Sequence, residues 1–357
     1  MPARATDGTC LAKLVRMAIP LFRAAQSQCP RMGPGRPPDF DDWKMAILIM
    51  VAILKNRKSK SAQYRFLHEH RRKLRRWLGL DRFPSRGTYF SRYARIHRLF
   101  QIAIRLQGLQ ALREGVARGK VVSVDKSLVA ARGPQWHAKD RKANRIPAGL
   151  HGVDRGSTWS FSKHHGWVQG YSYEVVVTAD KGTVLPLLAS ADTASVSEHV
   201  SFGPKIAQLP KVTRYVLADS GYDNNDYGDA VERDDHGRPT GRRFLCPANP
   251  RSGRVAPQPD RRLTAPQRQS RQRRRQRLAF YRSDAGRRLY SRRSQSVEPF
   301  NEWFKSLFGL DQTVWHRGLG NNQTQLLAAL FCYQLLLRHN HRTGHKNGQI
   351  QWILDTL

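Results

Sequence analysis

KVVSVDKSLVAA, residues 120–131, is a run of β-branched and apolar residues interrupted by one acid, Asp125. Such a run predicts a buried β-strand, in which a carboxylate is unusual. A second stretch, KVTRYVLADS at residues 211–220, predicts a strand that ends at Asp219. Both acids therefore lie at or near the carboxyl end of a predicted strand, where open α/β sheets place their active sites.

The segments around these strands predict a mixed sheet covered by helices. Residues 171–180 and 183–190 have the composition of two strands joined by a turn at residues 181–182. Helical segments follow, and residues 242–248 are a fifth strand candidate. Residues 132–170 show little periodicity, so no strand is predicted there. The order strand, hairpin, helix, strand, helix, strand predicts an α/β fold.

The chain before this sheet predicts a helical domain. Residues 43–54, WKMAILIMVAIL, are apolar nearly all round, as in the central helix of a small bundle. Short basic helices follow, and the stretch from Pro84 to Gly115 predicts one long amphipathic helix. We therefore expect a helical DNA-binding domain at residues 34–115, preceded by an N-terminal tail at residues 1–33. The alternative is that the charges only solvate a helical surface.

The charge balance indicates a nucleic-acid partner. The 357 residues include 62 Lys and Arg against 27 Asp and Glu, a net charge of +35. Such a chain is attracted to phosphate polymers. The longest apolar run, residues 45–54, is shorter than the roughly 20 residues that span a bilayer, so no membrane partner is expected. Without an export signal, and with four scattered cysteines, we expect a cytoplasmic, nucleoid-associated protein.

Residues 249–293 are almost purely basic and polar, and such a composition forms no core by itself. We expect a basic insertion that acts as a flexible arm and orders against DNA phosphates next to the active site. A solvated linker is the alternative. The candidate DNA contacts of this arm are Arg271, Arg273, Arg274 and Arg275. Residues 311–357 are expected to form a C-terminal helix and tail.

A third acid, Glu298, lies on a predicted helix at residues 296–310. Three carboxylates brought together repel one another unless a divalent cation such as Mg²⁺ neutralises them. Two such ions could support an in-line displacement at a phosphodiester. From spacing alone, the commoner interpretation of each acid is a strand-end cap or a salt-bridge partner for an arginine.

Three local patterns occur together and in order: VVSVDKS at residues 121–127, YVLADSGYDN at residues 215–224, and Tyr290-x₂-Arg293-x₄-Glu298-x₆-Lys305. With these patterns the chain resembles bacterial insertion-sequence transposases of the DDE class, in the subgroup with a Tyr-Arg-Glu-Lys signature. The resemblance extends from about residue 35 to 340 and includes PSRGTYFSR and WHRGLGNNQTQLLAAL.

The resemblance implies a ribonuclease-H-like catalytic domain, placed at residues 116–310. In that family the first Asp lies on the first strand, the second on the fourth strand and the Glu on a later helix. These positions transfer to Asp125, Asp219 and Glu298, which are the expected catalytic residues and metal ligands. Mg²⁺ is the implied cofactor, with Mn²⁺ as a substitute.

The same resemblance assigns contacts with DNA phosphates to Lys305, Tyr290 and Arg293. The chain departs from the signature because four residues, rather than three, separate Arg293 from Glu298. Glu302 lies one turn beyond Glu298 and is the alternative ligand.

The implied function is cleavage at the ends of a DNA element and strand transfer into target DNA. The implied partners are double-stranded DNA, in the form of terminal inverted repeats and target, and a second copy of the chain in a synaptic dimer. Two alternatives are a catalytically inactive, repurposed DNA-binding protein and a different nuclease on the same fold. His164 and His165 could suggest a metal site, but contact with DNA or a place in a surface loop is the commoner use of such a pair. Trp136, Trp159 and Trp315 either stack on bases or belong to the core.

Overall fold

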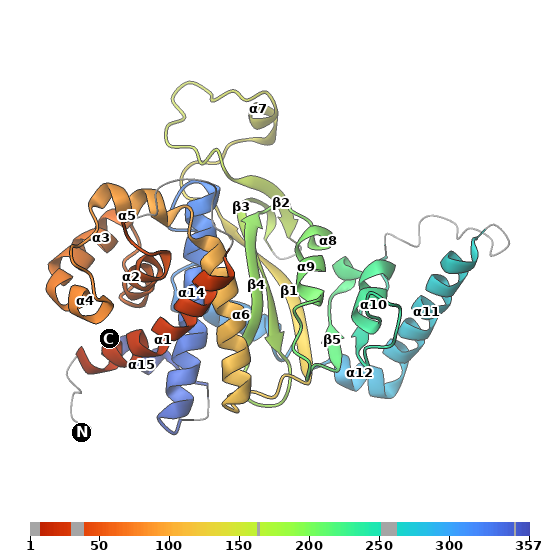
Figure 1. The fold of residues 1–357 in the computed structure, drawn as a ribbon. Helices are drawn as coiled ribbons and strands as arrows, with labels where there is room; N and C mark the ends of the chain where they lie inside the picture. Colours follow the sequence, from red (N-terminus) through yellow and green to blue (C-terminus); the bar gives the residue numbers. More distant parts are fainter. Residues whose placement is uncertain (1–7, 30–38, 163–164, 251–262, 346–347) are drawn as a thin grey trace.

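The computed structural model describes residues 8–29, 39–162, 165–250, 263–345 and 348–357 (Figure 1). It has a mixed α/β architecture, with a curled mixed sheet and helices packed against it. Within these ranges no helix is long and apolar enough to cross a membrane.

Six helices precede the sheet: α1 (Gly8–Gln28), α2 (Asp42–Leu54), α3 (Lys60–Glu69), α4 (Arg71–Leu78), α5 (Arg86–Tyr93) and α6 (His97–Arg113). The expected N-terminal tail is wrong for residues 8–28, because α1 buries Leu14 and Phe22 completely. α2 buries eleven of its thirteen residues, as its apolar sequence predicts.

The single long helix expected between residues 84 and 115 is instead divided into α5 and α6. The division has a tertiary cause. Thr324 donates a hydrogen bond of 2.7 Å from its hydroxyl to the carbonyl of Tyr93. Gly320 packs so closely that a Cβ there would lie 2.3 Å from the carbonyl oxygen of Ala94. Amphipathic spacing within residues 84–115 carries no information about these contacts.

The sheet is built around β1 (Val121–Ala130). β1 pairs antiparallel with β3 (Gly166–Thr178) and parallel with β5 (Tyr215–Leu217), which in turn pairs parallel with β6 (Arg243–Leu245). The far edge of β3 pairs with β2 (Thr158–Ser162) and β4 (Pro186–Thr193).

β2 corrects the expectation for residues 132–170, because this short edge strand has only one buried residue, Thr158, and so no apolar alternation. It also makes the strand before Asp219 the fifth along the chain, whereas the resemblance implied the fourth.

The later helices are α7 (Ala138–Lys142), α8 (Glu198–Ser201), α9 (Gly203–Ile206), the 3₁₀ turn η1 (Ser220–Tyr222), α10 (Asn225–Glu232), α11 (Ala265–Arg282), α12 (Asp284–Tyr290), α13 (Val297–Leu307), α14 (Leu319–Arg342) and α15 (Gln351–Thr356). α14 connects the N-terminal helices to the sheet, because it packs against α1, α2 and α6 as well as β4 (Figure 1). The N-terminal helices and most of the sheet consequently share one hydrophobic core.

The flexible-arm expectation is wrong for residues 265–290, which form α11 and α12 beside α10 (Figure 1). Thr264 and Gln267 form a capping box at the start of α11, and arginines of α11 pair with acids of α10 and its preceding loop. These pairs substitute for the apolar contacts that the composition lacks. Residues 251–262 of the predicted insertion lie outside the described residues.

Candidate active site

The carboxylate of Asp125 accepts hydrogen bonds from two side chains that follow α12 in the sequence. Its Oδ1 accepts a hydrogen bond of 2.7 Å from Nη2 of Arg293, and its Oδ2 accepts one of 2.8 Å from Nδ2 of Asn301. The Asp125 side chain retains 17% of its exposure. This mostly buried carboxylate therefore has a charged partner, Arg293, and a neutral hydrogen-bond donor, Asn301.

Arg293 links the first acid to the third. While its Nη2 binds Asp125, its Nη1 lies 3.1 Å from Oε1 of Glu298 in the first turn of α13. The guanidinium is largely buried, with 12% of the side chain exposed, whereas Glu298 is well exposed. One guanidinium thus pairs with two of the three predicted acids.

Asp219 reaches the same region through the parallel pairing of β1 and β5. Ser123 pairs with Leu217, so Asp125 and Asp219 each lie two residues beyond the same rung of the ladder. The Asp219 side chain caps η1 by accepting a hydrogen bond of 2.8 Å from the backbone N–H of Gly221. Asp219 therefore lies just past the carboxyl end of β5, whereas Asp125, which was expected at or near a strand end, lies in the middle of β1, because β1 continues to Ala130 alongside β3.

The charges of Asp219 and Glu298 both act on Asp125. Burial raises the pKa of Asp125 and Arg293 opposes this, while the negative charges of Asp219 and Glu298 raise it further, to about 7. Three acids with only one arginine among them leave an excess of negative charge, and such an environment favours an additional cation.

Lys305 and Tyr290 flank this group. Lys305 donates a hydrogen bond of 2.9 Å from Nζ to the carbonyl of Leu128 on β1, and burial lowers its pKa. Tyr290 packs edge-on against Tyr281, and burial raises the pKa of its phenol. Glu302, the alternative third acid, is exposed, and among the described contacts it is Glu298 that shares Arg293 with Asp125.

Among the arginines predicted to bind DNA, Arg273 and Arg274 pair with acids of the protein itself. Arg273 pairs with Asp229 at 2.6 Å, and Arg274 pairs with Asp223 at 2.5 Å. Together with the neighbouring Arg277, they hold α11 against α10. Arg271 and Arg275 lie on the same helix, and their role stays a prediction.

The tryptophans singled out in the sequence are buried or half-buried, whereas His165 is exposed. Trp136 and Trp315 are buried, with 3% and 4% exposure, so their core interpretation is confirmed. Trp159 is half-buried and donates its indole N–H to the carbonyl of Trp136. His165 is exposed, and His164 lies outside the described residues.

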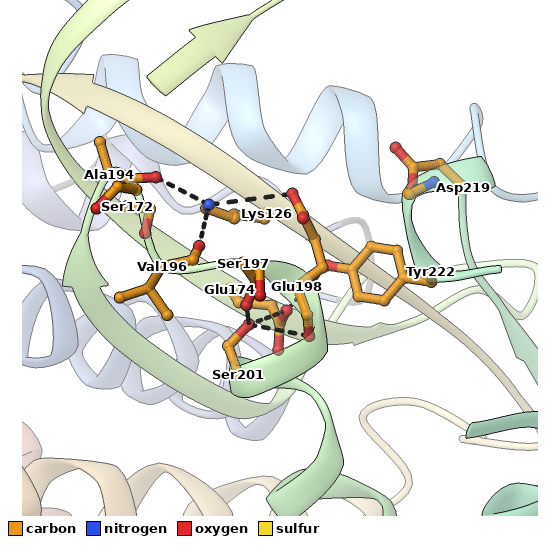
Figure 2. Close-up of polar contacts among 12 residues, drawn as sticks. Lys126, Ser172, Glu174, Ala194, Val196, Ser197, Glu198, Ser201, Asp219 and Tyr222 are labelled. Atoms are coloured by element: carbon orange, nitrogen blue, oxygen red, sulfur yellow. Dashed lines mark hydrogen bonds and ion pairs between the residues drawn. The ribbon is translucent and has the colours of Figure 1, made fainter. Parts of the chain in front are cut away.

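Two features of the site escaped sequence reasoning. Asn301 lies one helical turn after Glu298, so helical spacing could have placed it on the same face. Glu174 is the single acid in the apolar run of β3, the same signal that singled out Asp125. Figure 2 shows Glu174 near Tyr222, in the turn that carries Asp219.

The side chains as placed do not form a ready metal cage. No group of three or more His, Cys, Asp or Glu in the described part of the chain is arranged to hold a metal ion. The chemistry of Asp125, Asp219 and Glu298 nevertheless fits a hard divalent cation, since all their donors are carboxylate oxygens. The charge of Arg293 already lies among these acids.

A family model described as "Transposase DDE domain" matches residues 117–335, more than half of the chain. The chain belongs to this family. No curated protein and no solved structure matches it. The transposase domain thus includes all three acids, the whole sheet and most of α14, and the helices α1 to α6 precede it.

Proposed function

We propose that this transposase cleaves phosphodiester bonds at the ends of a bacterial insertion sequence and joins the freed 3′ ends to target DNA. The observation that carries the proposal is that Arg293 pairs with both Asp125 and Glu298, while the register of β1 with β5 brings Asp219 beside Asp125. A ribonuclease-H-like assignment is supported by a central strand with an antiparallel neighbour on one side and two parallel strands on the other.

Asp125, Asp219 and Glu298 would hold Mg²⁺, or Mn²⁺ in its place. Divalent ions at such a site activate an attacking oxygen and stabilise the leaving oxygen of the phosphodiester. Asn301 orients the Asp125 carboxylate, and the rigid pairing of β1 with β5 fixes the separation of the two aspartates. Charges that are already in position stabilise the transition state most, because they need no rearrangement during the reaction.

Arg293, Lys305 and Tyr290 are the proposed phosphate contacts. Arg293 has a buried Nε without a hydrogen-bond partner among the described residues, which leaves one donor unsatisfied beside the acids. Lys305 places a cation on the face of α13 that approaches β1. Both groups would hold the scissile phosphate against the carboxylates.

The substrate is proposed to be double-stranded DNA, bound by a homodimer that pairs two terminal repeats. The net charge of +35 supports a polyanionic partner. The helices α2 to α6 are the proposed DNA-binding part, and nucleoid association follows from the same affinity.

The test is cleavage of end-labelled duplexes that carry the inverted repeats flanking the gene, with Mg²⁺ or Mn²⁺. We expect nicking at the repeat boundary that disappears in Asp219→Ala. Asp226→Ala is the matched control, because Asp226 is an exposed acid on the next turn. Repeat-specific binding without cleavage by the wild type would favour a repurposed DNA-binding protein, and cleavage of any duplex would favour a general nuclease.

A further inference from the structure

A buried polar cluster lies on the face of the sheet opposite Asp125. Lys126 of β1 and Glu174 of β3 are register partners, and both alternate away from the face that carries Asp125. The cluster is completed by residues of α8, α9 and η1 (Figure 2). None of these residues belongs to the acid triad.

Glu174 is the centre of this cluster. Its side chain is 2% exposed, and its Oε1 lies 2.7 Å from Nζ of Lys205, which is itself 4% exposed. Its Oε2 accepts hydrogen bonds from the hydroxyls of Ser201 and Tyr222, the latter at 3.0 Å. Lys205 alone can neutralise the charge of Glu174. The additional hydrogen bond from Tyr222 is therefore not needed for charge balance, and its effect is to hold Tyr222 in place.

Tyr222 belongs to the turn that carries Asp219. Asp219 is the N-cap of η1, and Tyr222 is the last residue of that short turn. The bond from Tyr222 to Glu174 therefore fastens the turn of the second aspartate to β3, and β3 pairs from Gly170 to Thr178 with β1, the strand of the first aspartate.

A second contact confines the same turn. Nζ of Lys126 donates to the carbonyls of Ala194 and Val196 and lies 4.0 Å from Oε1 of Glu198. A Cβ at Gly221 would lie 3.0 Å from Oδ1 of Asp219 and 3.9 Å from Cδ of Glu198. The carboxyl groups of Asp219 and Glu198 thus both lie close to the middle residue of η1.

We propose that Glu174, acting through Tyr222, is a positioning residue that sets Asp219 relative to Asp125. Glu174 would contact neither the substrate nor the metal. It would act on the relative position of the two aspartates and so on their affinity for a divalent cation. Outer partners of this kind affect metal affinity strongly. The inference rests on the proposed function of the acid triad.

The test uses the full chain and Tyr222→Phe, which removes only the hydroxyl that reaches Glu174. Tyr227→Phe is the matched control, because Tyr227 is also largely buried but donates to the carbonyl of His199. Mn²⁺ binding is measured by calorimetry, the cleavage rate is measured against Mn²⁺ concentration, and thermal unfolding is recorded in parallel.

We expect Tyr222→Phe to weaken Mn²⁺ binding about tenfold and to raise the Mn²⁺ concentration for half-maximal cleavage by a similar factor. Tyr227→Phe is expected to match the wild type in both. A merely structural role would lower the unfolding temperature of Tyr222→Phe without changing its Mn²⁺ affinity.

Glu174→Gln keeps an acceptor oxygen for Tyr222, so it should retain more Mn²⁺ affinity than Glu174→Ala. If Asp219→Asn loses Mn²⁺ binding while Tyr222→Phe binds like the wild type, the positioning role is refuted and the triad stands. If the wild type binds no Mn²⁺, the proposed function fails, and this inference fails with it.

Discussion

Replacing Lys205 by Met tests the energetics of the buried ion pair with Glu174. Nζ of Lys205 makes three short contacts, at 2.7 Å to Oε1 of Glu174, 2.6 Å to Oγ of Ser190 and 2.7 Å to the carbonyl of Ser201. Lys205→Met removes all three and leaves the Glu174 carboxylate in a site with 2% exposure.

The expected cost is about 3–5 kcal/mol, which is typical when one partner of a buried ion pair is removed. The hydrogen bonds from Ser201 and Tyr222 solvate the remaining carboxylate but do not neutralise it. Because natural domains are stable by only about 5–15 kcal/mol, the loss is a large share of the total. Urea denaturation followed by tryptophan fluorescence measures it.

The double variant Glu174→Gln, Lys205→Met removes the buried charge as well. We expect it to be more stable than Lys205→Met alone by at least about 1 kcal/mol, since neighbouring substitutions couple on this scale. Lys211→Met is the control at an exposed lysine and should change stability by less than about 0.5 kcal/mol. A loss below about 1 kcal/mol in Lys205→Met, or strict additivity in the double variant, would refute this reasoning.

Burial raises the pKa of Glu114, but hydrogen bonds from Arg338 and a neighbouring arginine outweigh it and lower this pKa to about 2. Ionised Glu114 therefore stabilises the fold above the unfolded-state pKa. Its advantage over Glu114→Gln should be present at pH 7 and vanish as urea midpoints are followed down to about pH 2. Gly170→Ala should destabilise the sheet, because its Cβ would lie 2.1 Å from the carbonyl oxygen of Val129, whereas Gly87→Ala in α5 meets only one atom at 3.8 Å and should leave the melting temperature unchanged or slightly higher. Arg277→Gln loses pairs with two acids of α10, so amide hydrogen exchange in α11 should accelerate about tenfold, and unchanged protection would contradict the role of these pairs.

Much of the sheet was predictable because its strands are apolar and bounded by turns. β1, β4, β5 and β6 lie where composition placed strands, and so does β3 from Tyr171 onward, although its first residues, from Gly166, lie where no strand was predicted. β2 was missed because Thr158 is its one buried residue and its apolar Phe161 is 56% exposed. α11 was missed because its stability comes from acids on α10, which no property of residues 265–282 reveals.

The site was predictable to a similar degree. Asp219 stands out as an acid at a strand end and Asp125 as the single acid in an apolar strand, and the register of β1 with β5 brings them together. Glu298 depended on the resemblance, since nothing in its helix distinguishes it from Glu302. The central position of Arg293 required the structure, because a link between residues 125 and 293 depends on how α12 and α13 pack against β1.

The position of α14 has a consequence for biosynthesis. Phe22 of α1 packs on Phe331 of α14 at 4.5 Å between ring centroids, so segments made early and late share one core. The apolar helix α2 leaves the ribosome long before residues 319–342 are made. At about 5–20 residues per second, this delay is on the order of 15 to 60 seconds. During that interval the nascent chain exposes an apolar helix, so chaperone capture during translation should precede folding, and a transcript truncated before α14 should yield aggregate instead of a partial transposase.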